Sequence, residues 1–183
     1  GLTIDSIQNL PPGIYSVTAS DAQGCTGSAT FNLPQPALLT LSAVAQPITC
    51  FGSNNGSVTL TAAGGTPSYT YTWNPAQSNG PLANSLSPGL YAATVTDANS
   101  CSANASATVN QPTALFTNVV SANATSFGGN EGWAYVLASG ATAPYTYTWS
   151  NGVSNDSIVN LLAGTYIVTV CDANGCCLPD TAV

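Results

Sequence analysis

Six cysteines are the residues with the most distinctive chemistry in this 183-residue sequence. They could bind zinc as thiolates or form disulfides. A zinc site made of cysteines alone usually shows paired C-x-x-C spacing, and the sequence has neither that spacing nor a histidine. We therefore expect disulfides, which place the protein in an oxidising compartment outside the cell.

The rest of the composition argues against catalysis and against charged partners. The chain has no Lys, Arg or His and seven carboxylates, so its net charge is −7. Nucleophiles are present, but the commonest general base is missing, and we expect no enzyme activity and no cofactor. A chain without cations cannot neutralise phosphates, so nucleic acid and anionic membrane surfaces are excluded as partners. Apolar runs such as 114–116 are too short for membrane insertion.

Two aromatic segments have the spacing of a binding platform, because residues 69–73 and 145–149 both read Tyr-Thr-Tyr-Thr-Trp. Side chains alternate along a strand, so the three rings of each segment share one face. Such a ladder could stack on the sugar rings of a surface glycan, or it could fill the core of a small sandwich. We expect core packing, because aromatic rings supply much of the apolar area of so small a domain.

Three aspartates also recur, each at the start of an Asp-Ala-x-x-Cys segment: Asp21, Asp97 and Asp172. Calcium takes about six to eight oxygen ligands, and one carboxylate per segment is far too few. We therefore expect no metal site. Each aspartate should instead cap main-chain amides in a hairpin turn in which Asn-Gly supplies positive φ.

These elements belong to an internal repeat. The Asp-Ala-x-x-Cys segments lie about 76 and 75 positions apart, and Gln35-Pro36 recurs as Gln111-Pro112. A unit of about 75 residues has the size of a small sandwich domain rather than of a solenoid turn. We expect beads on a string, with a partial repeat (later strands only) at 1–36, a complete one at 37–112 and a nearly complete one at 113–183.

Within a unit, short alternating runs are separated by turn residues. The ranges 57–62, 69–73, 91–96 and 105–109 have the period of strands, and no stretch has helical spacing over two turns. This pattern predicts an all-β fold of tandem immunoglobulin-like β-sandwiches. The Leu-x-Pro-Gly-x-Tyr sequence that ends at Tyr91 has the layout of a tyrosine corner.

The motif order resembles a known family. From Cys50 to Pro112 the chain contains Asn-Gly-Ser, Gly-Gly-Thr-Pro, Tyr-Thr-Tyr-Thr-Trp, Pro-Gly-Leu-Tyr and Thr-Val-Thr-Asp-Ala-Asn. This order is similar to the SprB-type repeat of Bacteroidota cell-surface adhesins, among them gliding-motility adhesins exported by type IX secretion. The resemblance implies a secreted or surface-attached, filament-like, non-catalytic protein.

In the middle repeat, Cys50 and Cys101 are the only cysteines, and we expect them to form a disulfide. The closed loop of about 50 residues would contribute about 4 kcal/mol in the chain-entropy model. The alternative is a pair of buried thiols.

The third repeat has Ser126 where the middle one has Cys50. Its own cysteines allow Cys171 to pair with Cys176 or with Cys177 around the turn, and the sequence cannot choose between them. Cys25 should then pair outside the sequence or with another chain, and Cys177 is the other candidate for an unpaired or inter-chain thiol.

Covalent sugar is a further expectation that follows from the resemblance. Bacteroidota O-glycosylate Asp-Ser/Thr followed by a small or aliphatic residue, and the sequence has this motif at Ser6, Ser157 and Thr181.

The functional expectation is a structural or adhesive protein outside the cell. The chain starts within one repeat and stops within another, so it would be a fragment or a processed subunit. It would be either a segment of a longer adhesin or a filament subunit whose open sandwiches are completed by strands of neighbouring chains. Its expected partners are itself, neighbouring repeats and surface glycans. The competing hypothesis is a carbohydrate-binding accessory module of a secreted protein.

Overall fold

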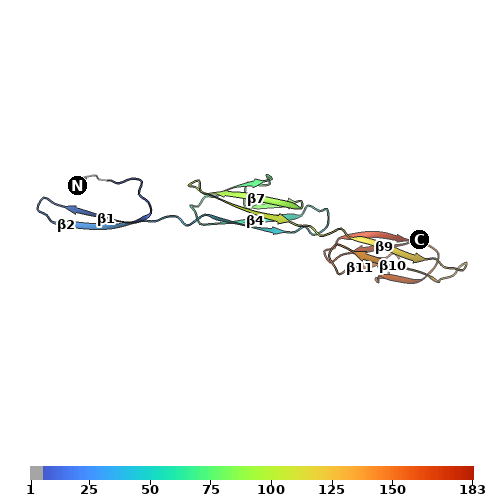
Figure 1. Cartoon of the computed structure of the whole chain (residues 1–183). Coiled ribbons are helices and arrows are strands. Elements are labelled where there is room, and N and C mark those ends of the chain that lie inside the picture. Colours follow the sequence, from blue (N-terminus) through green and yellow to red (C-terminus); the bar gives the residue numbers. More distant parts are fainter. Residues whose placement is uncertain (1–5) are drawn as a thin grey trace.

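The computed structural model describes residues 6–183, and within this range the chain forms 14 strands and no helix. The strands fall into three successive units that lie in a row (Figure 1). The all-β, immunoglobulin-like class expected from the sequence is confirmed. In chain order the strands are β1 (Gly13–Ser20), β2 (Thr26–Leu33), β3 (Thr40–Gln46), β4 (Gly56–Ala63), β5 (Thr70–Asn74), β6 (Leu82–Leu86), β7 (Gly89–Thr96), β8 (Ser102–Val109), β9 (Phe116–Ala122), β10 (Gly132–Ser139), β11 (Thr146–Trp149), β12 (Ser157–Leu161), β13 (Tyr166–Cys171) and β14 (Cys177–Ala182).

The middle unit is a sandwich of two antiparallel sheets, with strand orders β3-β4-β6 and β5-β7-β8. These are the A-B-E and C-F-G sheets of an immunoglobulin-like domain. Alternate residues of each strand point inward, so Val58 and Leu60 of β4 pack against Trp73 of β5 and Ala93 of β7. The period of two in the sequence therefore sets which side chains form the core.

The third unit repeats this plan with sheets β9-β10-β12 and β11-β13-β14. Its core contains Val136 of β10, Trp149 of β11, Ile158 of β12 and Val168 of β13. No helix that could cross a bilayer occurs among residues 6–183.

The first unit, as described from residue 6, is a single hairpin, in which β1 pairs with β2 from Gly13 opposite Leu33 to Ser20 opposite Thr26. By sequence it corresponds to β7 and β8 of the middle unit. Val17 takes the place of the buried Ala93, yet its side chain is 65% exposed, because no second sheet covers the hairpin.

The two Tyr-Thr-Tyr-Thr-Trp ladders point into the cores, as expected. Trp73 and Trp149 are 5% and 2% exposed. Each indole N–H donates to a main-chain oxygen at 2.9 Å, that of Gly80 and that of Asn155, so the polar edge of each ring is satisfied.

The tyrosine corner is also present. The Tyr91 hydroxyl donates to the Ser87 carbonyl at 3.0 Å, and the Tyr166 hydroxyl donates to the Leu162 carbonyl at 3.2 Å. These bonds fix the chain where it crosses from β6 to β7 and from β12 to β13.

A close contact anchors each linker to its unit. Gly64 has a φ of +75°, and a Cβ there would lie 2.0 Å from the Leu38 carbonyl oxygen; Gly140 has the same relation to Ala114. Only glycine permits this approach. The linker after Gln35-Pro36 is therefore held against the turn that precedes β5, and the linker after Gln111-Pro112 against the turn that precedes β11.

Candidate functional site

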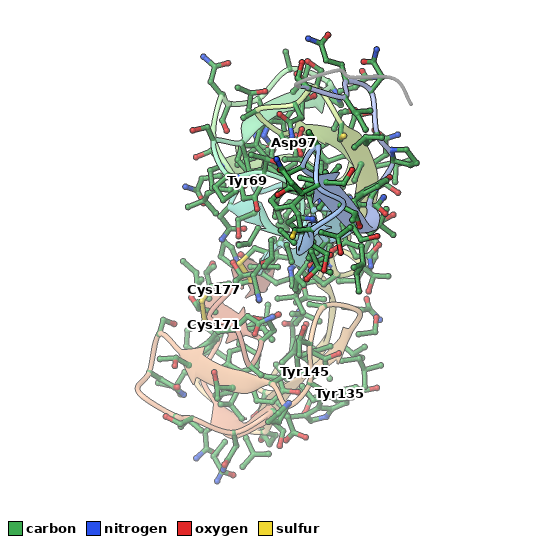
Figure 2. All side chains as sticks on the ribbon, turned by 90° about the vertical axis from the view of Figure 1, so that its left-hand side faces the viewer. Tyr69, Asp97, Tyr135, Tyr145, Cys171 and Cys177 are labelled. Atoms are coloured by element: carbon green, nitrogen blue, oxygen red, sulfur yellow. A yellow bond between two sulfur atoms is a disulfide. The ribbon has the colours of Figure 1, made fainter. Side chains whose placement is uncertain are left out.

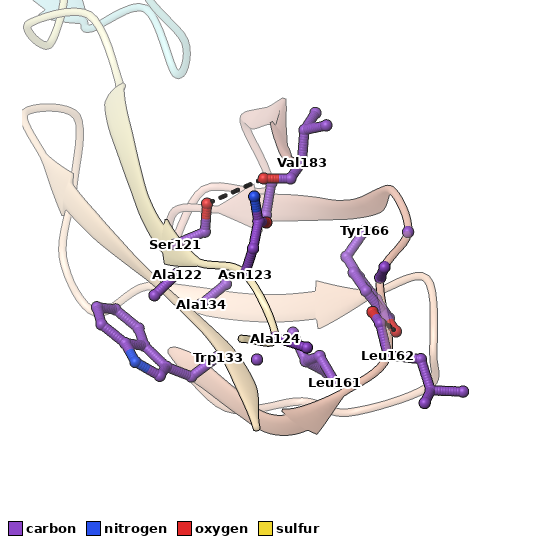
Figure 3. Close-up of a pocket in the computed structure, with 14 residues that line it drawn as sticks. Ser121, Ala122, Asn123, Ala124, Trp133, Ala134, Leu161, Leu162, Tyr166 and Val183 are labelled. Carbon is purple, nitrogen blue, oxygen red and sulfur yellow. Dashed lines mark hydrogen bonds between the residues drawn. The ribbon is translucent and has the colours of Figure 1, made fainter. Parts of the chain in front are cut away.

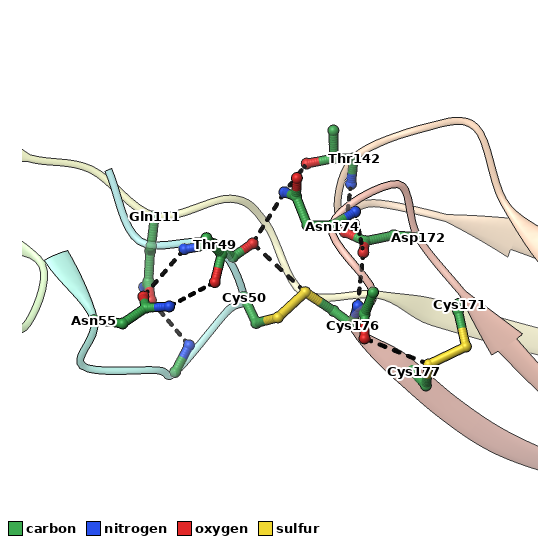
Figure 4. The surroundings of a disulfide bond; sticks show 12 residues. Thr49, Cys50, Asn55, Gln111, Thr142, Cys171, Asp172, Asn174, Cys176 and Cys177 are labelled. Atoms are coloured by element: carbon green, nitrogen blue, oxygen red, sulfur yellow. Dashed lines mark hydrogen bonds between the residues drawn. A yellow bond between two sulfur atoms is a disulfide. The ribbon is translucent and has the colours of Figure 1, made fainter. Parts of the chain in front are cut away.

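The junction between the middle and third units is closed by a disulfide. Cys50 lies in the loop after β3, and Cys176 lies in the turn between β13 and β14 of the next unit (Figure 4). Their sulfur atoms are bonded, with the Cα atoms 5.7 Å apart and a sequence separation of 126. Two neighbouring sandwiches are thus joined twice, through the main chain at Gln111-Pro112 and through this bond.

Hydrogen bonds hold both sides of the junction in place. Asn174 donates from its amide to the Thr49 carbonyl of the middle unit at 3.1 Å, and also to the Thr142 hydroxyl of its own unit. Gln111 of the linker accepts from the Gly52 N–H at 3.0 Å. The loop that carries Cys50 is therefore bound both to the linker and to the next unit (Figure 4).

The expected bond between Cys50 and Cys101 is not formed, and the strand directions explain why. Cys50 follows β3, whose end lies beside the end of β8, since the Ile48 N–H donates to the Asn110 carbonyl. Cys101 follows β7, which is antiparallel to β8 and ends at the other pole of the unit. A strand of eight residues spans about 26 Å, whereas bridged Cα atoms lie within about 7 Å of each other.

The remaining cysteines also differ in part from the expectation. Cys171 is bonded to Cys177, one of the two pairings the sequence left open, so Cys177 is not the leftover thiol (Figure 2). Cys176 is used by the neighbouring unit. Cys25 and Cys101 have free, exposed thiols.

Each recurring aspartate caps its turn as predicted. Asp97 accepts from the amides of Asn99 and Cys101 at 2.9 and 2.8 Å through one oxygen, and from Thr66 at 2.8 Å through the other. Its carboxylate is almost fully buried. Asp172 has the equivalent three bonds. Positive φ in the turn falls on Ser100 and on Gly175, the residue before the cysteine.

The donated hydrogen bonds favour the charged carboxylate. The Thr66 amide, followed by those of Cys101 and Asn99, lowers the pKa of Asp97 below its ordinary 3.8, while burial acts in the opposite direction. For Asp172, burial raises the pKa, but the amides of Cys176, Thr142 and Asn174 outweigh it and the net change is a lowering.

The middle and third units should consequently lose stability in acid. A carboxyl whose pKa is lower in the folded state stabilises the fold at pH values above its unfolded pKa. That contribution disappears as the pH falls through the folded value. We expect urea midpoints to be constant from pH 7 to pH 5 and to fall below about pH 4. Asp97→Asn should flatten this dependence for the middle unit and leave that of the third unit unchanged. Equal acid sensitivity in Asp97→Asn and the parent chain would contradict this account.

Burial of the ladder tryptophans leaves another aromatic pair as the exposed platform, which the sequence reasoning missed. Trp133 and Tyr135 lie on the outer face of β10 and stack, with ring centroids 5.7 Å apart and planes at 8°. They are 39% and 36% exposed. Leu137 and Val159 continue the same apolar face across β10 and β12.

This face differs between the two complete sandwiches. At the positions of Trp133, Tyr135 and Leu137 the middle unit has Ser57, Thr59 and Thr61. Both sets alternate with buried residues, so the fold does not demand aromatic rings there. The comparison of the two repeats, position by position, is the signal that could have found the platform from sequence.

A pocket at the far end of the third unit is a gap in packing rather than a binding site (Figure 3). It is lined by Trp133, Leu161, Tyr166 and other residues, and its volume is about 20 Å³. This space holds about one water molecule. In the middle unit, Ile48 fills the same place, where the third unit has Ala124.

The other predicted site residues are on the surface. Ser6, Ser157 and Thr181 are exposed, and Asp5, the first residue of one glycosylation motif, lies outside the described residues. Glycosylation at these positions stays a prediction. Among residues 6–183, no three Cys, Asp or Glu side chains are grouped closely enough to hold a metal ion.

The geometry thus defines a class, that of tandem immunoglobulin-like repeats with a cross-linked junction. Residues 42–78 and 118–154 match the family model described as SprB repeat. These matches lie in equivalent parts of the middle and third units. They support a non-enzymatic adhesin repeat module. No curated protein sequence matches the chain.

Solved structures similar to the chain include the following. The first eight Ig domains of Down syndrome cell adhesion molecule isoform 1.30.30 match with 16% identity, 93% coverage of this chain, 26% of that one and a TM-score of 0.40. The amphioxus IgVJ-C2 molecule matches with 12% identity, 77% coverage of this chain, 94% coverage of that one and a TM-score of 0.32. A tetra-tandem repeat from the extending region of a large adhesion protein matches with 20% identity, 96% coverage of this chain, 57% coverage of that one and a TM-score of 0.25. The chain spans about a quarter of the first of these structures.

Proposed function

We propose that the chain is an extracellular, load-bearing repeat segment of a surface adhesin. The observation that carries this proposal is the disulfide between Cys50 and Cys176, which joins two consecutive sandwiches rather than the strands of one. The bond adds a second covalent attachment between the two units. It keeps neighbouring units attached to each other under tension, and it requires an oxidising compartment.

The resemblance to SprB-type repeats supports a more specific form of the proposal, a surface adhesin of a Bacteroidota species exported by type IX secretion. Attached sugar at Ser6, Ser157 and Thr181 belongs to the same proposal. The intact mass of protein from the producing cells should then exceed the mass of the bare sequence. An unmodified mass would exclude glycosylation but leave the rest of the proposal standing.

The role itself is tested on producing cells. An antibody against residues 37–183 should label cells that have not been permeabilised. Deletion of that segment should lower the shear at which cells detach from a surface, and Cys50→Ser should give an intermediate value. Labelling that requires permeabilisation, or detachment at unchanged shear after deletion, would overturn the proposal.

The open hairpin supports a second element of the proposal, completion of the first unit by further strands. Val17 of β1 and Phe31 of β2 lie on the face of the hairpin that forms the core in the middle unit. They are 65% and 62% exposed, although the corresponding residues of the middle unit lie between two sheets. Strands from a neighbouring chain would assemble a filament. Electron microscopy of the purified chain distinguishes filaments from isolated rods.

Carbohydrate binding is a second candidate function, favoured by the exposed Trp133–Tyr135 pair rather than by the ladders. The outer ring face of such an exposed pair suits the apolar face of a sugar ring. We expect neutral oligosaccharides to quench tryptophan fluorescence. Trp133→Ala should weaken their binding by about tenfold. Val44→Ala, an exposed apolar change on the equivalent face of the middle unit, is the matched control. Equal binding by both variants would exclude this face.

A further inference from the structure

The middle unit has an open recess at the pole that faces the first hairpin. One wall is the linker, Gln35 to Leu39, and the other is the turn between β7 and β8, with Asn99 and Cys101. The recess measures about 190 Å³, and the exposed thiol of Cys101 lies in its wall. Nothing in the described chain, residues 6–183, is bonded to this thiol.

The corresponding recess in the third unit has a further wall, which comes from the preceding unit. Its walls are the linker residues 113–115 and the turn residues 175–177, which correspond by sequence to 37–39 and 100–102. Cys50 and Phe51 of the preceding unit line that recess, and Cys50 is bonded to Cys176, the counterpart of Cys101. The recess of the third unit is thus bordered by a loop of the preceding unit, whereas the recess of the middle unit has no such wall among the described residues.

The asparagine two residues before the cysteine also differs between the two units in its contact with a preceding loop. Asn174 donates both to the Thr142 hydroxyl of its own unit and to the Thr49 carbonyl of the preceding one. Asn99, its counterpart, makes the bond to its own Thr66 hydroxyl at 2.8 Å. The carbonyl that would complete its pair of bonds would come from a preceding loop.

We propose that Cys101 and Asn99 form a docking site for the cysteine loop of the repeat that contains β1 and β2. The occupant is the loop of the preceding repeat that is equivalent to Thr49–Asn55. It lies N-terminal to Thr49–Asn55 on the same polypeptide, at the distance in sequence that separates Gln35 from Gln111. A second copy of this chain cannot supply that loop, because its own Cys50 is already bonded to Cys176. The bond between Cys50 and Cys176 is then one member of a series in which each unit is tied to the one before it.

The bond forms by thiol–disulfide exchange. The Cys101 thiolate attacks the loop cysteine held as a mixed disulfide with a small thiol such as glutathione. The new sulfur–sulfur bond forms as the old one breaks, and the glutathione thiolate leaves and takes up a proton. The number of disulfides is unchanged, so no further oxidant is needed.

The full chain tests this directly with a peptide probe. The probe is Thr-Cys-Phe-Gly-Ser-Asn-Asn, the sequence of residues 49–55, as its glutathione mixed disulfide. Cys25 is the internal control, because it occupies the same turn of the first hairpin without a described recess. At exchange equilibrium we expect about fivefold more peptide on Cys101 than on Cys25, the ratio that one net hydrogen bond supplies. Asn99→Ala should remove this preference, and equal occupancy in the parent chain would overturn the proposal.

An extended chain provides a second measurement that does not rely on a flexible peptide. A copy of residues 37–76 placed before Gly1 restores the early strands and one added cysteine loop in the natural register. Disulfide mapping should find the added cysteine bonded to Cys101, with Cys25 alkylated as a thiol. Free thiols at both positions while Cys50–Cys176 is intact, or a covalent dimer through Cys101, would overturn the docking site.

Discussion

Pulled at its two ends under oxidising conditions, the chain should extend by about 430 Å less than the same chain after treatment with a reductant. Tension passes from Cys50 to Cys176 through the sulfur atoms, so residues 51–175 carry none of it. At about 3.4 Å per extended residue, the sequence separation of 126 gives this difference. Single-molecule force spectroscopy measures it as the total contour length released.

Two variants make the measurement specific. Cys50→Ser should release the full length without reductant. The double variant Cys171→Ser, Cys177→Ser should behave like the oxidised parent to within about 20 Å, because that bond bridges a sequence separation of 6. If oxidised and reduced chains release the same length, the bond between the units does not exist in solution.

Replacement of Trp149 by alanine should destabilise the third unit by about 3–5 kcal/mol, which is most of the stability of a small domain. The ring is 2% exposed and packs within the core, so its removal leaves a cavity and an unpaired Asn155 carbonyl. Urea unfolding followed by circular dichroism should show the third unit unfolded or with a strongly lowered midpoint. The middle unit should keep its own transition.

Trp133→Ala is the matched control for this prediction. It removes the same ring from the same unit, but from the outer face of β10, and surface substitutions usually change stability by about 0.5 kcal/mol or less. A cost for Trp133→Ala similar to that for Trp149→Ala would mean that the outer face is covered in solution.

The features that sequence predicted correctly are those fixed by short-range rules. The period of two in Tyr-Thr-Tyr-Thr-Trp places the rings on one face. Because a small domain needs their apolar area in its core, that face is the inner one. Asp97 caps its turn because its partners lie two and four residues ahead, and the Tyr91 corner joins residues four apart. None of these depends on how units are arranged.

The cysteine pairing depends on which pole of a unit each cysteine occupies, and composition and spacing do not give this. Cys50 and Cys101 share a repeat, but tracing β3, β7 and β8 places them at opposite poles. The pole that carries Cys50 meets the next unit only because the linker after Gln111 is short and held against the turn at Gly140. Pairing between repeats is therefore a property of the junction.

The exposed aromatic face was missed for a different reason. The residues that the repeats share are core and turn residues, because the fold needs these in every unit. Trp133 and Tyr135 occur where the units differ, and a platform specific to one unit appears as such a difference. Differences between otherwise matching repeats are thus the better guide to binding surfaces.

The two covalent connections between the middle and third units also restrict rotation about the long axis. A joint made by the linker alone works as a swivel, whereas two separated attachment points transmit torque. The third unit carries Ser126 in place of a cysteine at its own far pole, where it bonds to Glu131 instead. A row of such units would be stiff against twisting at its sulfur-linked joints and free to turn at the others, so the distribution of cysteine along the repeats would set where the row can rotate.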